Sequence, residues 1–226
     1  MSIWNNGGTS ELKKRGAPVN MPALVVLFAA SSVAAQQRAI EPKDVAVFNR
    51  GVSSLSDGTR KGVRLSSSPG DGVAYLRGIE FGNGTVELDI RGKEVQGQSF
   101  VGIAFHGVDG ATYDAIYFRP FNFKTPDPTR RSHAVQYISH PTYTWQKLRA
   151  ERPGTFEQPV SPAPDPNAWF HVRVVVASPK VSVFVGEAKQ PSLVVNQLSD
   201  RTKGLVGLWV GNNSDGEFAN VAINPN

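Results

Sequence analysis

From residue 45 onward the chain consists of short segments in which apolar and polar residues alternate, separated every 8 to 12 residues by Gly, Pro, Asn, Asp or Ser. In Gly84–Arg91, for example, Val86 and Leu88 fall on one side of the segment while Glu87 and Asp89 fall on the other. A period of two is the signature of a strand with one buried face, and helical periodicity is nearly absent. The pattern therefore predicts an all-β fold.

Twelve segments fit this alternation, and that number of short strands is typical of two stacked sheets. We expect a two-sheet jelly-roll sandwich of antiparallel strands. The expected strands are Val45–Asn49, Gly62–Ser66, Val73–Leu76, Gly84–Arg91, Phe100–His106, Tyr113–Arg119, Ala134–Ser139, Trp169–Ala177, Val181–Gly186, Ser192–Val195, Leu205–Val210 and Phe218–Ile223.

One segment, Pro141–Asn167, breaks the alternation because it is rich in proline. Its only expected helical turn is Trp145–Glu151. Connections of this length are uncommon and are usually functional, although a surface excursion without a ligand is the alternative. We expect the segment to form a rim beside the sheets.

An apolar run near the N-terminus, Met21–Ala35, follows three basic residues at 13–15 and ends in small residues. This pattern predicts a secretory signal peptide at residues 1–35, cleaved before Gln36, and a jelly-roll domain at residues 36–226. A membrane anchor is the alternative, but a span needs about 20 apolar residues. We expect the mature protein to be secreted or periplasmic, with no membrane contact after cleavage.

The composition excludes several kinds of chemistry. The 226 residues include no Cys, which excludes a disulfide framework, a thiolate metal site and a Cys nucleophile. Removal of residues 1–35 lowers the formal net charge from +5 to +3. Because the basic residues also alternate with acidic ones, we expect no nucleic acid as a partner.

Aromatic and polar residues are densest in Phe100–Arg149. Small residues precede His106 at alternate positions, and small residues on a sheet face leave room for a ligand. Antiparallel pairing of the neighbouring strands would place His106, Tyr117 and Arg119 on one surface, with Gln136 as their outward partner. An aromatic ring can pack on the apolar face of a sugar, and the paired N–H donors of an arginine can bind its hydroxyl groups.

These residues define a candidate site for carbohydrate. We assign substrate binding to Gln136, Asp114, Arg131, His140 and Trp145, beside His106, Arg119 and Tyr117. Each has a purely structural alternative, since Tyr117 could be a packed aromatic, Arg119 an ion-pair partner and either histidine a satisfied core residue.

Metal and nucleophile motifs are weak in this sequence. There is no HxH or HExxH motif, which argues against a zinc site, and no GxSxG motif, which argues against a nucleophilic serine of the α/β-hydrolase type. We expect no cofactor, with calcium bound through Asp109 as the alternative. Glu87 and Asp89 share one strand face and would lie over a groove if that face is concave, or in solvent if it is not.

The sequence resembles the concanavalin A-like lectin/glucanase superfamily, and within it exported bacterial proteins with 3-keto-disaccharide hydrolase-like, or family 16 glycoside hydrolase-like, domains. The segments that carry this resemblance are Gly82–Ile90 (GNGTVELDI), Phe100–Pro120, Arg130–Arg149 (RRSHAVQYISHPTYTWQKLR), Trp169–Val176, Gly204–Val210 and Phe218–Ile223.

The resemblance implies a carbohydrate ligand on a concave sheet and, for some relatives, cleavage of a glycosidic bond. True glucanases carry Glu-x-Asp followed by a second Glu, but here Arg91 and Gly92 stand where that Glu would follow Glu87 and Asp89. Family 16 catalysis is therefore not expected. The 3-keto type of reaction would need a base and an electrophile, roles that His106 with Arg119 or Tyr117 would fill.

Three functions remain open at this level. The first is an enzyme of the glycoside hydrolase or lyase class. The second is a carbohydrate-binding module without catalysis, and the third is a protein-interaction module of the laminin G type.

Overall fold

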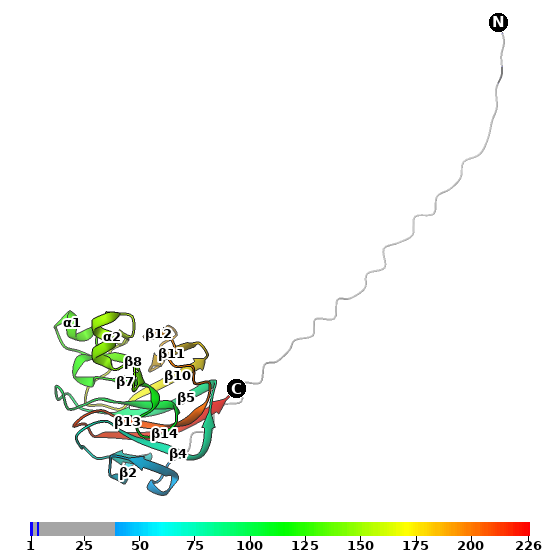
Figure 1. Cartoon of the computed structure of the whole chain (residues 1–226). Coiled ribbons are helices and arrows are strands. Elements are labelled where there is room, and N and C mark those ends of the chain that lie inside the picture. The colour runs from blue at the N-terminus through cyan, green and yellow to red at the C-terminus, as the bar shows by residue number, and fades with distance from the viewer. Residues whose placement is uncertain (2–3, 5–38) are drawn as a thin grey trace. The chain divides into compact units, whose positions relative to one another are not determined.

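The computed structural model describes residues 1, 4 and 39–226, which contain two antiparallel sheets of seven strands each (Figure 1). In spatial order the first sheet comprises β1 (Val45–Phe48), β4 (Gly72–Phe81), β13 (Gly204–Val210), β6 (Val101–Gly107), β7 (Tyr113–Phe118), β8 (Val135–His140) and β9 (Glu157–Gln158). The second comprises β12 (Leu193–Asn196), β11 (Lys180–Val185), β10 (Phe170–Ala177), β5 (Gly84–Arg91), β14 (Gly216–Pro225), β3 (Arg60–Leu65) and β2 (Val52–Asp57).

The core lies between the two sheets, where the apolar side of each alternating strand is buried. Phe118 of β7 packs edge-to-face on Phe170 of β10, with ring centroids 5.3 Å apart. Both side chains are buried, and burial of each contributes roughly 1.5–3 kcal/mol. Because successive side chains point to opposite faces, Tyr117, next to Phe118, lies on the outer face of the first sheet.

A glycine on β6 brings two aromatic rings together on that outer face. Gly102 pairs with Trp209 of β13 on one side and with Tyr117 of β7 on the other. Since Gly102 has no side chain, the rings of Trp209 and Tyr117 approach to a centroid distance of 4.8 Å. The small residue expected to leave room for a ligand instead lets this aromatic pair form.

Two short helices accompany the connections at one end of the sandwich. Asp127 caps α1 (Pro128–Arg131) with its side chain, and Thr144 caps α2 (Trp145–Glu151) by accepting a hydrogen bond from the Lys147 amide. Figure 1 shows α2 next to β8, with α1 beside α2. Two 3-10 turns, Pro42–Asp44 and Pro120–Asn122, complete the secondary structure of the described residues.

The predicted all-β sandwich of two antiparallel sheets is confirmed. All twelve expected strands are present within a few residues of their predicted ends, and the helical turn expected at Trp145–Glu151 is α2. The sequence analysis did not predict β2, β9 or α1. β2 (VSSLSD) is an edge strand, so its exposed, serine-rich sequence shows little alternation.

The predicted signal peptide lies outside the described residues. Within residues 39–226, no helix combines the length and the apolar character that crossing a membrane requires.

Candidate functional site

Two neighbouring hollows lie on the outer face of the first sheet and share Phe100 and Trp145 as walls. We call the first, of about 60 Å³, the aromatic pocket; its lining is Asp71, Phe100, Tyr117, Ile138, His140, Trp145, Trp209, Gly211 and Asn212. We call the second, of about 240 Å³, the arginine pocket; its lining is Gln96, Gly97, Phe100, Arg119, Phe121, Asn122, Arg130, His133, Trp145 and Arg149.

A chain of hydrogen bonds orders the polar side of the aromatic pocket. The Trp209 indole donates to the Tyr113 hydroxyl at 3.0 Å, and that hydroxyl donates to the Asp71 carboxylate at 3.2 Å. The His140 ring stacks on Tyr113, with a centroid distance of 5.2 Å and an interplanar angle of 24°. These contacts therefore hold Asp71, just before β4, and His140, at the end of β8, at fixed positions at the pocket.

Burial favours the neutral form of both groups in this pair. Burial lowers the pKa of His140, against the opposing charge of Asp71, whose carboxylate oxygen lies 3.8 Å from the His140 Nδ1. Burial likewise raises the pKa of Asp71, although His140 and the hydrogen bond from Tyr113 oppose it. Near pH 7 the imidazole of His140 is thus unprotonated and able to accept a proton.

Tyr117, Arg119 and Gln136 are brought together, as predicted. Tyr117 pairs directly with Gln136 across β7 and β8, and its hydroxyl donates to the Gln136 amide oxygen at 2.9 Å. Arg119 donates to the same amide oxygen and, at 2.6 Å, to the Tyr117 hydroxyl. Burial raises the pKa of Tyr117 to about 12 and lowers the pKa of Arg119. All three side chains are buried and bonded to one another, so they are not the exposed sugar-contacting groups that the sequence analysis expected. Tyr117 lines the aromatic pocket and Arg119 the arginine pocket, whereas Gln136 lines neither.

The expectation that His106 shares this surface is wrong. The register of β6 with β13 shifts between Leu205 and Gly207, and His106 adopts a positive φ of 49° at this irregularity. The extra residue turns the imidazole to the inner side, where its Nε2 bonds the Gly82 carbonyl at 2.9 Å. Because His106 is completely buried, it is not available as a base at the outer face.

Asp114, which the sequence analysis placed in the substrate site, also lies inside the sandwich. It accepts hydrogen bonds from the Tyr137 hydroxyl at 2.9 Å and from the Ser199 hydroxyl at 2.6 Å, and it pairs with Arg201 at 3.1 Å. No part of its surface is exposed. Its position follows from strand alternation, which places it on the same side as Phe118.

The remaining predicted residues divide between the pockets and the periphery. Trp145 is 40% exposed and forms a wall of both pockets, and His140 lines the aromatic pocket. Arg131 instead donates to the Thr125 carbonyl at 3.0 Å, and it lines neither pocket. Its expected role in substrate binding therefore has no support from its position.

The sequence analysis missed several residues that line the pockets. Arg149 had a usable signal, because a helix starting at Trp145 places residues four positions apart on one face. Its guanidinium lies 4.9 Å from the Trp145 ring. Asp71 directly precedes β4 and Trp209 lies in β13, so only the strand order shows that they line the same pocket as His140.

The paired carboxylates of β5 lie on the outer face of the second sheet, away from both pockets. Asp89 accepts hydrogen bonds from His171 at 2.9 Å, from Asn220 at 2.8 Å and from Arg60 at 3.1 Å. Its oxygens are therefore engaged within the sheet. The hydrogen bond from His171 holds the pKa of Asp89 below its ordinary value despite partial burial.

Asp109, considered for calcium, has a structural role in the β6–β7 hairpin. One of its carboxylate oxygens accepts the backbone amides of Ala111 at 2.8 Å and Thr112 at 2.7 Å. Within the described part of the chain, no group of three or more metal-ligating side chains is found.

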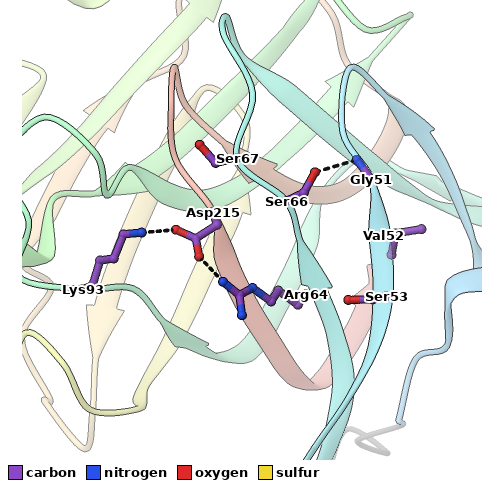
Figure 2. A pocket seen from close by; sticks show the side chains of 8 residues that line it. All are labelled: Gly51, Val52, Ser53, Arg64, Ser66, Ser67, Lys93 and Asp215. Carbon is purple, nitrogen blue, oxygen red and sulfur yellow. Dashed lines mark hydrogen bonds and ion pairs between the residues drawn. The ribbon is translucent and has the colours of Figure 1, made fainter.

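A larger hollow, of about 630 Å³, lies elsewhere, beside β2 and β3 (Figure 2). Figure 2 shows Arg64 and Lys93 reaching Asp215 from two sides, at 2.6 and 2.5 Å. Its lining has no aromatic residue, and its charged side chains already pair with one another. The outer face of the first sheet is the better candidate site, because it combines aromatic walls with polar groups.

Comparisons with known proteins identify the fold. No family model matches the sequence, and no curated protein matches it. Among solved structures, the carbohydrate-binding module CBM66 from Bacillus subtilis matches with a TM-score of 0.50 and 16% identity, over 76% of this chain and 93% of that one.

Two further structures agree. A B. subtilis protein of unknown function with a galectin-like fold has a TM-score of 0.52 and 14% identity, over 80% of this chain and 89% of its own. A candidate glycosyl hydrolase from Parabacteroides distasonis has a TM-score of 0.50 and 14% identity, over 82% and 90%. The chain thus has a galectin-like sandwich fold.

Proposed function

We propose that this protein binds a saccharide on the outer face of its first sheet, over the aromatic pocket. The observation that carries the proposal is the arrangement of Trp145 and Trp209 beside Asp71, His140 and Asn212. Aromatic rings suit the apolar faces of a sugar, while carboxylate, imidazole and amide groups suit its hydroxyls. The likeness of the fold to a carbohydrate-binding module supports the proposal.

The experiment is a glycan array followed by calorimetry with the best ligand. Because Trp145 is 40% exposed at the pocket wall, Trp145→Ala is expected to weaken binding about tenfold, the loss of about 1.4 kcal/mol of contact. The matched control is Trp169→Phe, which changes a tryptophan beside Asp57 on the other sheet and should leave binding unchanged. Absence of binding to every glycan, or equal effects of both variants, would overturn the proposal.

Cleavage of the bound glycoside is a second candidate function, favoured by the pair formed by His140 and Asp71 at the pocket. We propose His140 as the base, since burial keeps its imidazole unprotonated. In a 3-oxo glycoside, the base would remove the proton next to the ketone. A carbon–carbon double bond would then form as the glycosidic C–O bond breaks, and the leaving oxygen would depart with the electron pair and take up a proton.

A screen of plain and 3-oxo glycosides tests this reaction. His140→Asn should abolish turnover while leaving saccharide binding within about threefold. If the wild-type protein binds glycans but cleaves neither series, the chain is a binding module and the catalytic proposal fails.

We also propose that the protein is exported to the periplasm or the medium. The support is the sequence at residues 13–35, with its basic cluster, apolar run and terminal small residues. N-terminal sequencing of the protein recovered from a secreting host should begin at Gln36. Recovery of an uncleaved chain in the membrane fraction would contradict export.

A further inference from the structure

The arginine pocket has more positively charged side chains than the neighbouring carboxylates can neutralise. Arg149 forms two hydrogen bonds with the buried Glu157 carboxylate, at 2.9 and 2.7 Å. Arg119 lies 3.8 Å from the same carboxylate. Glu157 therefore serves two guanidinium groups at once, although it carries a single negative charge.

The third guanidinium, that of Arg130, has only neutral partners. It donates to the side-chain oxygen of Asn122 and to the Phe121 carbonyl, both at the long distance of 3.3 Å. Within residues 39–226, no carboxylate pairs with Arg130. Burial lowers the pKa of His133, so this neighbour adds no positive charge near pH 7, and the excess comes from the arginines alone.

The walls of the pocket strengthen the attraction of this charge. Phe100, Phe121 and Trp145 line it with apolar surface, and charges act more strongly where water is displaced by such surface. Guanidinium groups also match the two oxygens of a carboxylate or sulfate with paired hydrogen bonds. The lining includes no acidic side chain that would repel an anion.

We propose that the arginine pocket binds the anionic group of an acidic saccharide, a sugar unit that carries a carboxylate or a sulfate. The inference rests on the proposed function, because the neighbouring unit of the same saccharide would lie over the aromatic pocket. The two pockets share Phe100 and Trp145, so adjacent units of one chain would lie on either side of these rings. A volume of about 240 Å³ is suited to a single unit rather than a long segment.

The experiment compares three series of oligosaccharides of equal length: neutral, uronate-containing and sulfated. The protein comprising residues 36–226 is titrated at low and at physiological salt. The wild-type protein should bind at least one acidic series tenfold more tightly than the neutral series. The preference should shrink as salt increases, because ions screen the attraction. The acidic series that binds more tightly identifies the anion.

Arg130→Gln is the decisive variant, because the Arg130 side chain makes only two long hydrogen bonds. It should remove most of the preference for acidic saccharides and leave neutral binding unchanged. Arg131→Gln is the matched control: it removes the same charge from the same helix, but Arg131 lies outside the pocket. Thermal denaturation verifies that both variants fold.

The outcomes separate this inference from the proposed function. Equal binding of neutral and acidic series overturns the arginine-pocket proposal and leaves saccharide binding intact. Equal losses in Arg130→Gln and Arg131→Gln also overturn it, because the preference would then reflect overall charge. Absence of binding in all three series overturns both proposals.

Discussion

At the scale of single residues, the outer face of the second sheet contains a titratable pair whose geometry is fixed by strand register. His171 of β10 lies directly opposite Asp89 of β5, and the His171 Nδ1 is 2.9 Å from an Asp89 oxygen. This hydrogen bond, together with the charges of Asp89 and Glu87, raises the pKa of His171 against the effect of burial. The pair therefore couples stability to pH.

We predict that His171→Asn lowers the melting temperature most between about pH 4 and pH 6.5. A raised pKa in the folded state means that the contribution of His171 is complete below about pH 6.5, the unfolded value, and is lost as pH rises through the folded value. The lowered pKa of Asp89 means that its own contribution is lost as the solution becomes strongly acidic. Melting curves from pH 3 to 9 measure the difference between wild type and variant, and a difference independent of pH would contradict the prediction.

Residue-scale prediction from the sequence succeeded for Tyr117 and Gln136 but failed at His106, at a strand irregularity, and at Asp114, whose inward side followed from alternation. Alternation placed Tyr117 and Gln136 correctly on one face, because a period of two fixes the side of every residue. At His106 an extra residue in β6 reverses the side, and nothing in the local sequence marks that reversal. This single bulge places His106, the base expected from the sequence, in the core instead of on the outer face.

At the scale of elements, α2 is attached to the sheet through the buried Leu148, which belongs to the core, and through Arg149. Its guanidinium holds Glu157 of β9, which is 3% exposed, and packs against Trp145 at the start of the same helix. The position of Trp145 between the two pockets thus depends on an ion pair at the far end of the helix.

We predict that Arg149→Gln lowers the free energy of unfolding by about 2 kcal/mol, less than a fully buried pair would lose, because Arg149 is partly exposed. Glu157 would remain buried with weaker partners. The control is Lys147→Gln, which removes the exposed pair with Glu151 and should cost under about 0.5 kcal/mol. Urea denaturation measures both, and equal effects would contradict the role assigned to Arg149.

Elements with a buried face were predictable, whereas small polar ones were not. Gly84–Arg91 was predicted to the residue because its apolar side packs on the core. β2 and β9 bury little apolar surface and pair through their backbones at the sheet edges, so their side chains give no periodic signal. The pockets themselves depend on strand order, since Asp71 and His140 are 69 positions apart in the sequence.

At the scale of the whole molecule, Asp114 ties a connection between the two sheets to the interior of the first. The segment Gln197–Arg201 leads from β12 in the second sheet to β13 in the first. Ser199 and Arg201 both donate to Asp114. Burial acts to raise the pKa of Asp114, but the hydrogen bonds of the network, including that from His106, hold it below its ordinary value.

We predict that Asp114→Asn costs about 3 kcal/mol of stability, because an amide places donor hydrogens against neighbouring donors and leaves buried groups unpaired. The backbone amides of residues 197–201 should also exchange hydrogen faster in this variant than in the wild-type protein. The matched control is Asp200→Asn in the same connection, where the side chain is exposed and little change is expected. Equal stability of the two variants would show that the network does not hold the sheets together.

The indole of Trp145 separates two compartments, and this has a thermodynamic consequence. A ligand that fixes this ring from one compartment also fixes it as the wall of the other, so ordering of the ring costs the second ligand no further entropy. Occupancy of one compartment must therefore change the affinity of the other, and linkage requires the two effects to be equal in size. In a saccharide that spans Trp145, the first sugar unit would position the ring before the second unit binds. Affinity should therefore rise more with each added unit than the sum of the separate contacts of the units predicts.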